Sequence, residues 1–543
     1  MFTVSIGSKK ITFNAPCALG DILREHCDKY CVAALVDGRI CDLNKVVDYD
    51  CVIEPLDLTS EDGVRIYYRT LKFVFIMAVK KLFPDAEVLF MYGLSRGQYC
   101  EINGITFSID VIRKIETEMQ FIIKQNIPFI KETISKQSAD EIYSRCGYND
   151  KVELLRYRPE NTAHIYRCGK ECNYLYGYMM PSTGYLRGFK LHFHPPGLVV
   201  MYPRHELGGQ IPDFEQSVKF DKALWRAEEW GKVCGVCNIA GLNRTIESGN
   251  FKNLVNMSEI RHEDEISGIA RNIADDIKNI KLVLIAGPSS SGKTTFSRKL
   301  RTHLAIKGIQ SIPVSCDDYF LDLESFNAAV GGNVDLEHIE RIDLAKFNED
   351  LVNIISGKKV TLPSYNFEKG KRETGKTVQL AKDGCVIVEG IHGLNENLTC
   401  LIPRYNKYKI YISALSHINI DDHTPISTTT CRLIRRAVRD NKFRGTSIED
   451  TLAMWKSVRK GEFRWIYPYQ EEADYIFNSE LTYELAVLKK YIMPLIESIP
   501  RTSPYFITIN KIQKIMKYVI SVDDDVVPST SLLREFIGGS NYV

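Results

Sequence analysis

Residues 287–294 read G-P-S-S-S-G-K-T, and this stretch constrains the fold more than any other part of the chain. It fits the pattern G-x-x-x-x-G-K-[ST], in which glycines let the backbone wrap closely around a phosphate and successive N–H groups face the anion. The apolar run Leu282–Ala286 precedes it and the helical stretch Thr295–Lys307 follows, which is the context that such a loop requires. We therefore predict a phosphate-binding loop between a buried strand and a helix. The alternative is a chance match in a Gly/Ser turn.

Within this loop the lysine and the threonine have separate roles. Lys293 is expected to reach the β- and γ-phosphates of a nucleoside triphosphate, and the Thr294 hydroxyl is expected to ligate Mg²⁺. The residues predicted to hold the nucleotide here are Gly287, Ser289, Ser290, Ser291, Gly292, Lys293, Thr294 and Thr295. The loop indicates only that a nucleoside triphosphate binds as the phosphate donor, so the acceptor has to be inferred from other residues.

Further apolar runs alternate with helical patterns after the loop. They cover Ile312–Ser315, Val386–Val388 and Ile410–Ile412. Apolar strands separated by helices indicate an α/β fold with a parallel sheet and helices on both faces.

Two of these runs end in acids. Asp317 and Asp318 follow the first of them, at the edge where open α/β sheets bind ligands, so one of the two could orient and deprotonate an attacking hydroxyl. A helix N-cap made by an Asp is the alternative. Glu389 closes the next run and suits a Mg²⁺ contact beside the loop, with a turn acid as its alternative. His392 is expected only to fill the turn that follows.

A basic helix is predicted over residues 432–440. The arginines on this helix that we assign to the triphosphate are Arg432, Arg435, Arg436 and Arg439. Three cations on one face without interleaved acids repel one another unless an anion lies there, and the phosphates would supply it. Arg436 is taken as the one that stabilises the transferring phosphoryl. The alternative is a solvated helix that binds Asp440 or Glu449.

A tyrosine and an amide stand together in Pro363–Phe367, which reads P-S-Y-N-F. An aromatic ring with a neighbouring amide could stack on a base and hydrogen-bond to it, and core packing is the alternative. The lysines and the arginine that follow, up to Arg372, lie in a Gly-containing loop.

Length and charge limit the whole chain. At 543 residues it is long enough for about three domains. Its 70 Lys and Arg against 68 Asp and Glu, a net charge of +2, give no support to a protein whose whole surface binds nucleic acid. The first residues lack a signal peptide's apolar core and no run spans a bilayer, so we expect cytoplasmic residence and no membrane partner.

Taken together and in order, these motifs resemble the uridine kinase and phosphoribulokinase family of P-loop kinases. The resemblance runs from about Ile260 to the C-terminus and includes Val334-Asp335 and Glu389-Gly390-Ile391. It implies ATP and Mg²⁺ as cofactors, Asp317 as the catalytic base, and Glu389 as support for Mg²⁺. It also implies an arginine-rich lid.

On the acceptor side the resemblance implies that Asp335 binds the ribose hydroxyls and that Tyr365 lies at the base. Phe367 and Arg372 are counted with them as substrate-binding. The chain has Asn366 where human-type uridine–cytidine kinases carry Asp, and no His follows. The expected acceptor is therefore the 5′-hydroxyl of a pyrimidine nucleoside in nucleotide salvage: uridine or cytidine first, with thymidine left open.

The first half resembles parts of threonyl-tRNA synthetases. Residues 1–58 resemble the small ubiquitin-like α+β TGS domain, and residues 59–245 resemble the α+β editing-type domain, which leaves 246–543 for the kinase. At the editing domain's metal-ligand positions this chain has Arg69, Phe73, Leu175 and Met179, so the resemblance implies that editing chemistry is lost.

Three alternatives stay open. One is an RNA-binding regulatory protein in which the P-loop only senses nucleotide and the first half contacts tRNA. Another is a sugar-phosphate kinase. The third concerns the pairs Cys168/Cys172 and Cys234/Cys237, which are expected to be buried thiols but could form a four-thiolate zinc site. Members of the kinase family often associate, so a homo-oligomer is also expected.

Overall fold

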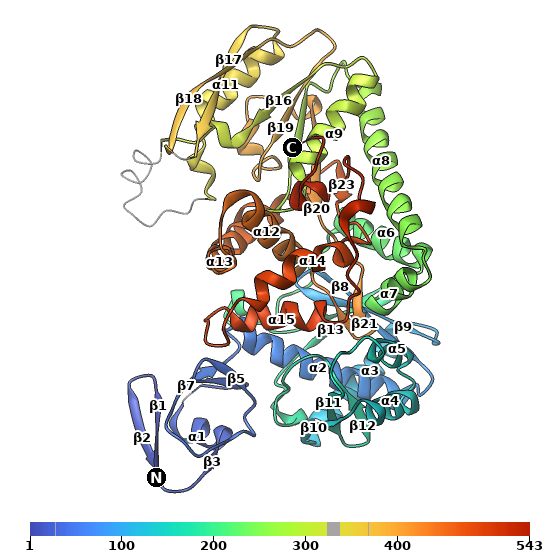
Figure 1. The fold of residues 1–543 in the computed structure, drawn as a ribbon, viewed down its shortest axis with the longest axis vertical. Helices are drawn as coiled ribbons and strands as arrows, with labels where there is room; N and C mark the ends of the chain where they lie inside the picture. Colours follow the sequence, from blue (N-terminus) through green and yellow to red (C-terminus); the bar gives the residue numbers. More distant parts are fainter. Residues whose placement is uncertain (28, 323–336, 368, 543) are drawn as a thin grey trace.

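The computed structural model describes residues 1–543 except 28, 323–336, 368 and 543. Figure 1 shows the N-terminal strands at one end of the long axis and the parallel sheet toward the other. The C-terminus lies beside that parallel sheet, far from the N-terminus.

The first region is a five-stranded sheet in the order β2-β1-β7-β4-β5. β1 and β7 pair in parallel, as Val4 opposite Cys51 shows, and α1 covers the sheet with Leu19, Ile22 and Leu23. All of this lies within residues 2–56 and is the mixed α+β module that the short alternating runs predict. The elements are β1 Phe2–Ile6, β2 Lys9–Phe13, β3 Cys17–Ala18, α1 Leu19–His26, β4 Ala33–Val36, β5 Arg39–Cys41, β6 Val46–Val47 and β7 Cys51–Leu56.

The second region contains two antiparallel sheets, β13-β14-β9-β8 and β10-β11-β12. Helix α2 is capped by the Ser60 hydroxyl, which accepts from Gly63 N, and it buries one long apolar face. The elements are α2 Glu61–Leu82, β8 Glu87–Leu94, β9 Gly97–Asn103, α3 Ile109–Lys124, β10 Phe129–Ser135, α4 Lys136–Arg145, α5 Asn149–Leu155, β11 Thr162–Cys168, β12 Glu171–Asn173, β13 Lys190–His194, β14 Gly197–Met201, α6 Val218–Cys234 and α7 Ile239–Glu247.

The positions of the editing-type metal ligands come together in the second region, but in its apolar core. Phe73, Leu175 and Met179 belong to one buried cluster. Beside them the Arg69 guanidinium donates to the carbonyls of Leu175 and Tyr178 at 2.9 and 2.7 Å. Side chains of this kind cannot hold a catalytic metal.

The two cysteine pairs are not grouped together, and the expectation that all four are buried thiols is wrong for Cys237. In the part of the chain that the structure describes, no group of three or more His, Cys, Asp or Glu side chains could hold a metal. Cys168 and Cys172 are buried and Cys237 is exposed.

Among the same described residues no helix is long and apolar enough to cross a membrane.

The third region is built on a parallel sheet in the order β16-β19-β15-β20-β23. Four of its strands coincide with the apolar runs of the sequence, whereas the fifth, β23, was not predicted. Ser315, Glu389 and Ile285 are aligned across three neighbouring strands. The elements are α8 Phe251–Asp275, β15 Leu282–Ala286, α9 Lys293–Ile306, β16 Ser311–Ser315, α11 Leu344–Ile355, β17 Val360–Asn366, β18 Lys371–Val378, β19 Cys385–Glu389, β20 Lys407–Ser413, β21 Asn419–Asp421, β22 Thr424–Pro425, α12 Thr428–Arg444, α13 Ile448–Trp465, β23 Tyr475–Asn478, α14 Glu484–Glu497, α15 Phe506–Met516 and α16 Arg534–Ile537.

Helices cover both faces of this parallel sheet. Along β15, Val283 and Ile285 belong to one buried cluster, which includes Phe296 of α9. Leu282 and Leu284 face the other way, into a second cluster that includes Phe347 of α11. This α/β architecture, with its sheet buried on both sides, is the fold class that the sequence predicts.

The second and third regions are joined by the hairpin β21–β22, which follows β20. The Lys151 ammonium of α5 makes an ion pair with Asp421, and the two side chains are only 3% and 0% exposed. Phe90 of β8 donates its N–H to the carbonyl of Asp422 at 2.8 Å, and Lys72 donates to the carbonyl of His423 at 2.7 Å. The hairpin is therefore an element of the third region whose polar groups are satisfied by the second region.

Candidate nucleotide and phosphoryl-transfer site

The phosphate loop connects β15 to α9 in a conformation that its small residues permit. Gly292 has φ +85° at the start of α9, a left-handed value that favours glycine. A Cβ added to Gly287 would lie 2.1 Å from the carbonyl oxygen of Ile412 on β20, so no larger residue fits there. The loop is thus pressed against the neighbouring strand and opens toward the carboxyl end of the sheet.

Lys293 and Thr294 make contacts within and beside the loop. The Lys293 ammonium donates to the carbonyls of Gly287 and Pro288 at 2.9 and 3.2 Å, so it stays folded over the loop. The Thr294 hydroxyl donates to Oε1 of Glu389 at 2.7 Å. A hydroxyl and a carboxylate oxygen at this distance offer two adjacent oxygen donors, the ligands that Mg²⁺ prefers.

The structure separates the roles of the two neighbouring aspartates. Oδ1 of Asp318 accepts from the backbone N–H of Tyr365 at 3.1 Å, which ties the acid turn to β17. The cap of the 3-10 turn is the Ser315 hydroxyl, which accepts from Asp317 N at 3.2 Å. The Asp317 carboxylate is therefore not needed as a cap, and it keeps an exposed face although protein atoms crowd around it. Of the pair, Asp317 is the acid placed to act as a base.

Burial shifts the pKa of each charged group in the site. Burial raises the pKa of Asp317 and of Glu389, and the nearby Lys293 ammonium opposes both rises. Burial lowers the pKa of Lys293, while Glu389 and other acids oppose that change. One cation and two acids thus share a poorly solvated space, an arrangement typical of functional sites.

We expect Glu389→Gln to weaken Mg²⁺-dependent nucleotide binding. The substitution removes the charge that faces Thr294, and losses of this kind cost about 10–100-fold in metal affinity. The measurement is a calorimetric titration of ATP at a series of Mg²⁺ concentrations. Glu349→Gln, at an exposed position of α11, is the control. Equal Mg²⁺ requirements in the two variants would show that Glu389 only caps the turn.

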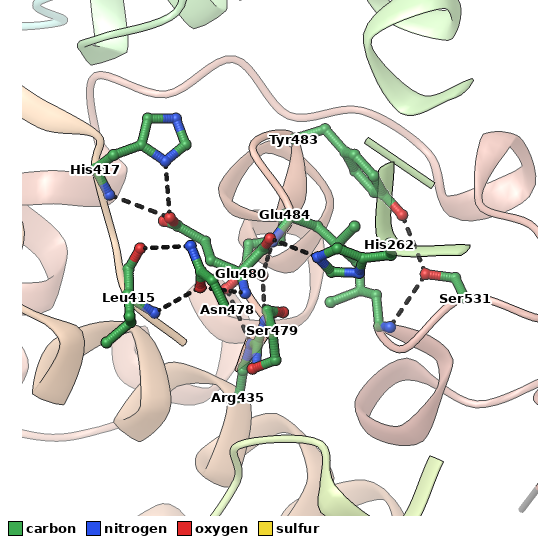
Figure 2. Close-up of polar contacts among 12 residues, drawn as sticks. His262, Leu415, His417, Arg435, Asn478, Ser479, Glu480, Tyr483, Glu484 and Ser531 are labelled. Carbon is green, nitrogen blue, oxygen red and sulfur yellow. Dashed lines mark hydrogen bonds and ion pairs between the residues drawn. The ribbon is translucent and has the colours of Figure 1, made fainter. Parts of the chain in front are cut away.

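The premise behind the assignment of the arginine helix is wrong, because each of its four arginines has an acid partner. The premise was that no acids balance the cations, but acids from distant elements do. Arg432 makes an ion pair with Glu462 of α13, and Arg435 makes one with Glu484 of α14; both arginine side chains are fully buried. Figure 2 shows Arg435 directed into the cluster with Ser479 and Glu484. Because each charge is already neutralised in the interior, neither arginine needs a phosphate.

The same helix still contacts the loop. Nη1 of Arg436 donates to the Ser289 hydroxyl at 2.9 Å, and Nε of Arg432 donates to the Ser289 carbonyl at 3.0 Å. Arg439 pairs with Asp440 at 2.8 Å, as the alternative interpretation of a helix that binds Asp440 had it. Arg436 is thus the predicted arginine whose side chain reaches a loop side chain, and its Nε also pairs with Asp440 at 3.2 Å. Arg432 contacts the backbone of the loop.

The predicted acceptor residues gather on the hairpin β17–β18. Tyr365 lies opposite Arg372 in the antiparallel register, and Phe367 lies with its ring centroid 5.1 Å from that of Tyr365. Arg372 is held by Asp343 at 2.9 Å, so its charge is shared with the protein. Asp335 lies outside the described residues.

An aromatic group that the sequence analysis did not select completes this side. The Phe320 ring lies 5.6 Å from Tyr365, and the Arg341 guanidinium lies 4.1 Å above the Phe320 ring. Tyr365 is only 6% exposed, and its hydroxyl is buried with no hydrogen-bond partner among the described residues. No local pattern marks Arg341, because its place depends on how two separate loops pack.

The loop fits a nucleotide. The Ser290 and Ser291 hydroxyls are buried and have no hydrogen-bond partner in the described part of the chain. Such hydroxyls are costly unless a ligand or water satisfies them. Together with the N-terminus of α9, they offer donors to a bound triphosphate, and Thr294 with Glu389 fits its Mg²⁺.

Comparison with family models agrees with this geometry. Residues 282–486, less than half of the chain, match the model of the Phosphoribulokinase / Uridine kinase family. The matched range begins with β15 and includes the loop, Asp317, Glu389 and the arginine helix.

The amino-terminal part is similar to threonine–tRNA ligases. The ligase of Wolbachia sp. subsp. Drosophila simulans (strain wRi) is 31% identical over 173 residues, which cover 32% of this chain and 27% of the relative. The ligase of Syntrophomonas wolfei subsp. wolfei is 31% identical over 165 residues, which cover 30% of this chain and 26% of the relative. The chain therefore spans only about a quarter of the length of these curated relatives.

Solved structures give weak likenesses. One is described as a possible uridine kinase from Bacillus stearothermophilus, with a TM-score of 0.27, 19% identity, and coverage of 40% of this chain and 99% of that one. Another is D-glycerate 3-kinase from Cryptococcus neoformans var. grubii. Its TM-score is 0.22 and its sequence identity 13%, and the match covers 49% of this chain and 89% of that one. At these scores they carry no argument about function. The fold and the family match together give the conclusion: residues 282–486 form a P-loop kinase fold similar in sequence to the phosphoribulokinase and uridine kinase family, behind a region similar to threonine–tRNA ligases.

Proposed function

We propose that the protein is an ATP-dependent kinase that phosphorylates the 5′-hydroxyl of a pyrimidine nucleoside. The observation that carries the proposal is the alignment of three strand ends. β15 leads into the phosphate loop, β19 ends at Glu389, and β16 leads into Asp317, so donor, metal and base positions lie side by side.

Each residue then has one task. Asp317 orients the acceptor hydroxyl and takes its proton, while Lys293 and Arg436 stabilise charge on the transferring phosphoryl. Thr294 and Glu389 would hold Mg²⁺, which neutralises the phosphates when it is bound. Most of the catalysis comes from this positioning and charge stabilisation, because phosphoryl transfer asks little covalent chemistry of the protein.

A nucleoside acceptor is favoured over a bare sugar phosphate by the aromatic group. Phe320, Tyr365 and Phe367 offer ring faces and edges to a base. The Tyr365 hydroxyl, which has no partner among the described residues, offers a hydrogen bond. Arg372, the cation opposite Tyr365, is already paired with Asp343. That pairing leaves Arg372 less suited to a second phosphate.

An acceptor screen with labelled ATP tests the proposal. We expect phosphorylation of uridine or cytidine, or of thymidine, at least about tenfold faster than of any sugar phosphate, because an unmatched buried hydroxyl is costly. Tyr365→Phe should lower the preference among nucleosides and leave ATP binding unchanged. A preference for sugar phosphates would contradict the nucleoside assignment, and no transfer to any acceptor, with ATP bound, would favour a nucleotide sensor.

A further inference from the structure

The C-terminal segment Thr530–Gly538 crosses the start of α9, where the phosphate loop ends. Oε2 of Glu535 accepts a hydrogen bond from the backbone N–H of Thr295 at 3.0 Å. Thr295 directly follows Thr294, and its amide is one of the first-turn N–H groups that have no partner within the helix. In loops of this kind such amides face the phosphates. A carboxylate of the same chain therefore occupies a donor that a nucleotide phosphate would use.

A second contact places this segment directly on the loop. A Cβ added to Gly292 would lie 2.5 Å from Cδ2 of Leu532, so Leu532 rests against the second glycine of the motif. The Lys299 ammonium, one turn further along α9, donates to the carbonyl of Thr530 at 3.0 Å. The contacts of Leu532 and Thr530 with the loop and α9 thus hold the segment that carries Glu535 close to the loop.

The charge of Glu535 acts on the catalytic groups. It is one of the acids that raise the pKa of Lys293 against the effect of burial, and it adds to the rise at Glu389. A triphosphate in the loop would bring negative charge to the same place. Two anions cannot share the Thr295 amide, so the carboxylate and the phosphates compete.

The backbone of the segment is anchored, whereas the Glu535 side chain is only half-buried. Phe536 and Ile537 are fully buried, and the Lys442 ammonium donates to the Ile537 carbonyl. Arg534 donates to the Val527 carbonyl at 2.6 Å. The side chain of Glu535 can therefore turn away from Thr295 while the rest of the segment stays in place.

We propose that Glu535 is a built-in competitor of the nucleotide, whose carboxylate must leave the Thr295 amide before phosphates bind there. The proposal rests on the proposed function insofar as the loop must bind a nucleoside triphosphate. The Glu535 contact weakens nucleotide binding by the protein, because only the fraction of molecules with Glu535 turned away from Thr295 can bind the phosphates.

The test compares the full chain with Glu535→Gln and Glu535→Ala by calorimetric titration with Mg²⁺-ATP. We expect the variants to bind about tenfold more tightly, since a charge-assisted hydrogen bond and a like charge are removed. The gain should recur with inorganic tripolyphosphate and be absent with adenosine. Glu497→Gln, at the exposed end of α14, is the control.

A second readout distinguishes competition from a purely structural role. An acid at a helix N-terminus stabilises the helix, so without ligand the Glu535 variants should have a lower thermal midpoint than the wild type. At saturating ATP the midpoints should converge, because the wild type has then lost the contact as well.

Four results would overturn the proposal. Equal ATP affinity in wild type and variants would leave Glu535 as a cap only, and so would an equal drop in thermal midpoint with and without ATP. An equal gain with adenosine would place the competition away from the phosphates. Failure of every protein to bind ATP or tripolyphosphate would overturn both this proposal and the proposed function.

Discussion

Asp317→Asn should lose phosphoryl transfer by about 10²–10⁴-fold while its affinity for Mg²⁺-ATP stays close to that of the wild type. The carboxylate is the only change, and its asparagine replacement keeps the size and the 3-10 turn that Ser315 caps. Initial rates with the best acceptor and calorimetric titration with ATP give the two numbers. Asp383→Asn, in an exposed turn before β19, is the control. Near-normal turnover of Asp317→Asn would show that another group takes the proton.

The pH profile adds an independent check on Asp317. A base must be deprotonated, so activity falls as the pH drops through its pKa. Burial raises the pKa of Asp317, and Lys293 opposes the rise only in part, so the acid limb should lie at higher pH than for an ordinary aspartate. The residual activity of Asp317→Asn should lack this limb. A limb that persists in the variant belongs to a different group.

Lys151→Met should destabilise the full chain by about 3–5 kcal/mol, because it leaves the Asp421 carboxylate buried without its counter-charge. Burial alone would raise the pKa of Asp421, but the Lys151 charge, together with His423 and hydrogen bonds from Lys151 and Tyr176, outweighs that effect and holds the pKa below its usual range. The urea midpoint, followed by circular dichroism, should fall by about 1 M or more.

A double substitution identifies the origin of that loss. Lys151→Met combined with Asp421→Leu removes both charges, and we expect it to recover at least half of the stability lost by the single variant. Lys170→Met, at an exposed position of the same region, should change little. If Lys151→Met behaves like this control, the ion pair contributes nothing to the joining of the two regions.

The strands and the loop could be predicted because their signals are local. Leu282–Ala286 is apolar at every position and is followed at once by the glycines of the loop, so strand, turn and helix are specified within about 25 residues. The parallel order of the strands then brings Asp317 and Glu389 to the same edge. This part of the candidate site follows from chain order and alternation alone.

The ion-paired arginines show where predictions from local sequence patterns fail. Arg432 and Arg435 have no acid partner on their own helix face, yet Glu462 and Glu484, 30 and 49 residues further on, neutralise them. Glu535 lies 240 residues from its partner Thr295. The ending Leu532–Gly539 resembles that of long uridine kinase-like proteins, but the resemblance does not indicate this contact. Contacts of this kind depend on how whole elements pack, and no periodicity or spacing encodes them.

The hairpin β21–β22 makes the second and third regions depend on each other. Asp421 and the hairpin carbonyls are satisfied by Lys151, Phe90 and Lys72, so separating the two regions would expose polar groups without partners. The second region therefore belongs to the structural support of the third, although Arg69 and Phe73 cannot hold a metal.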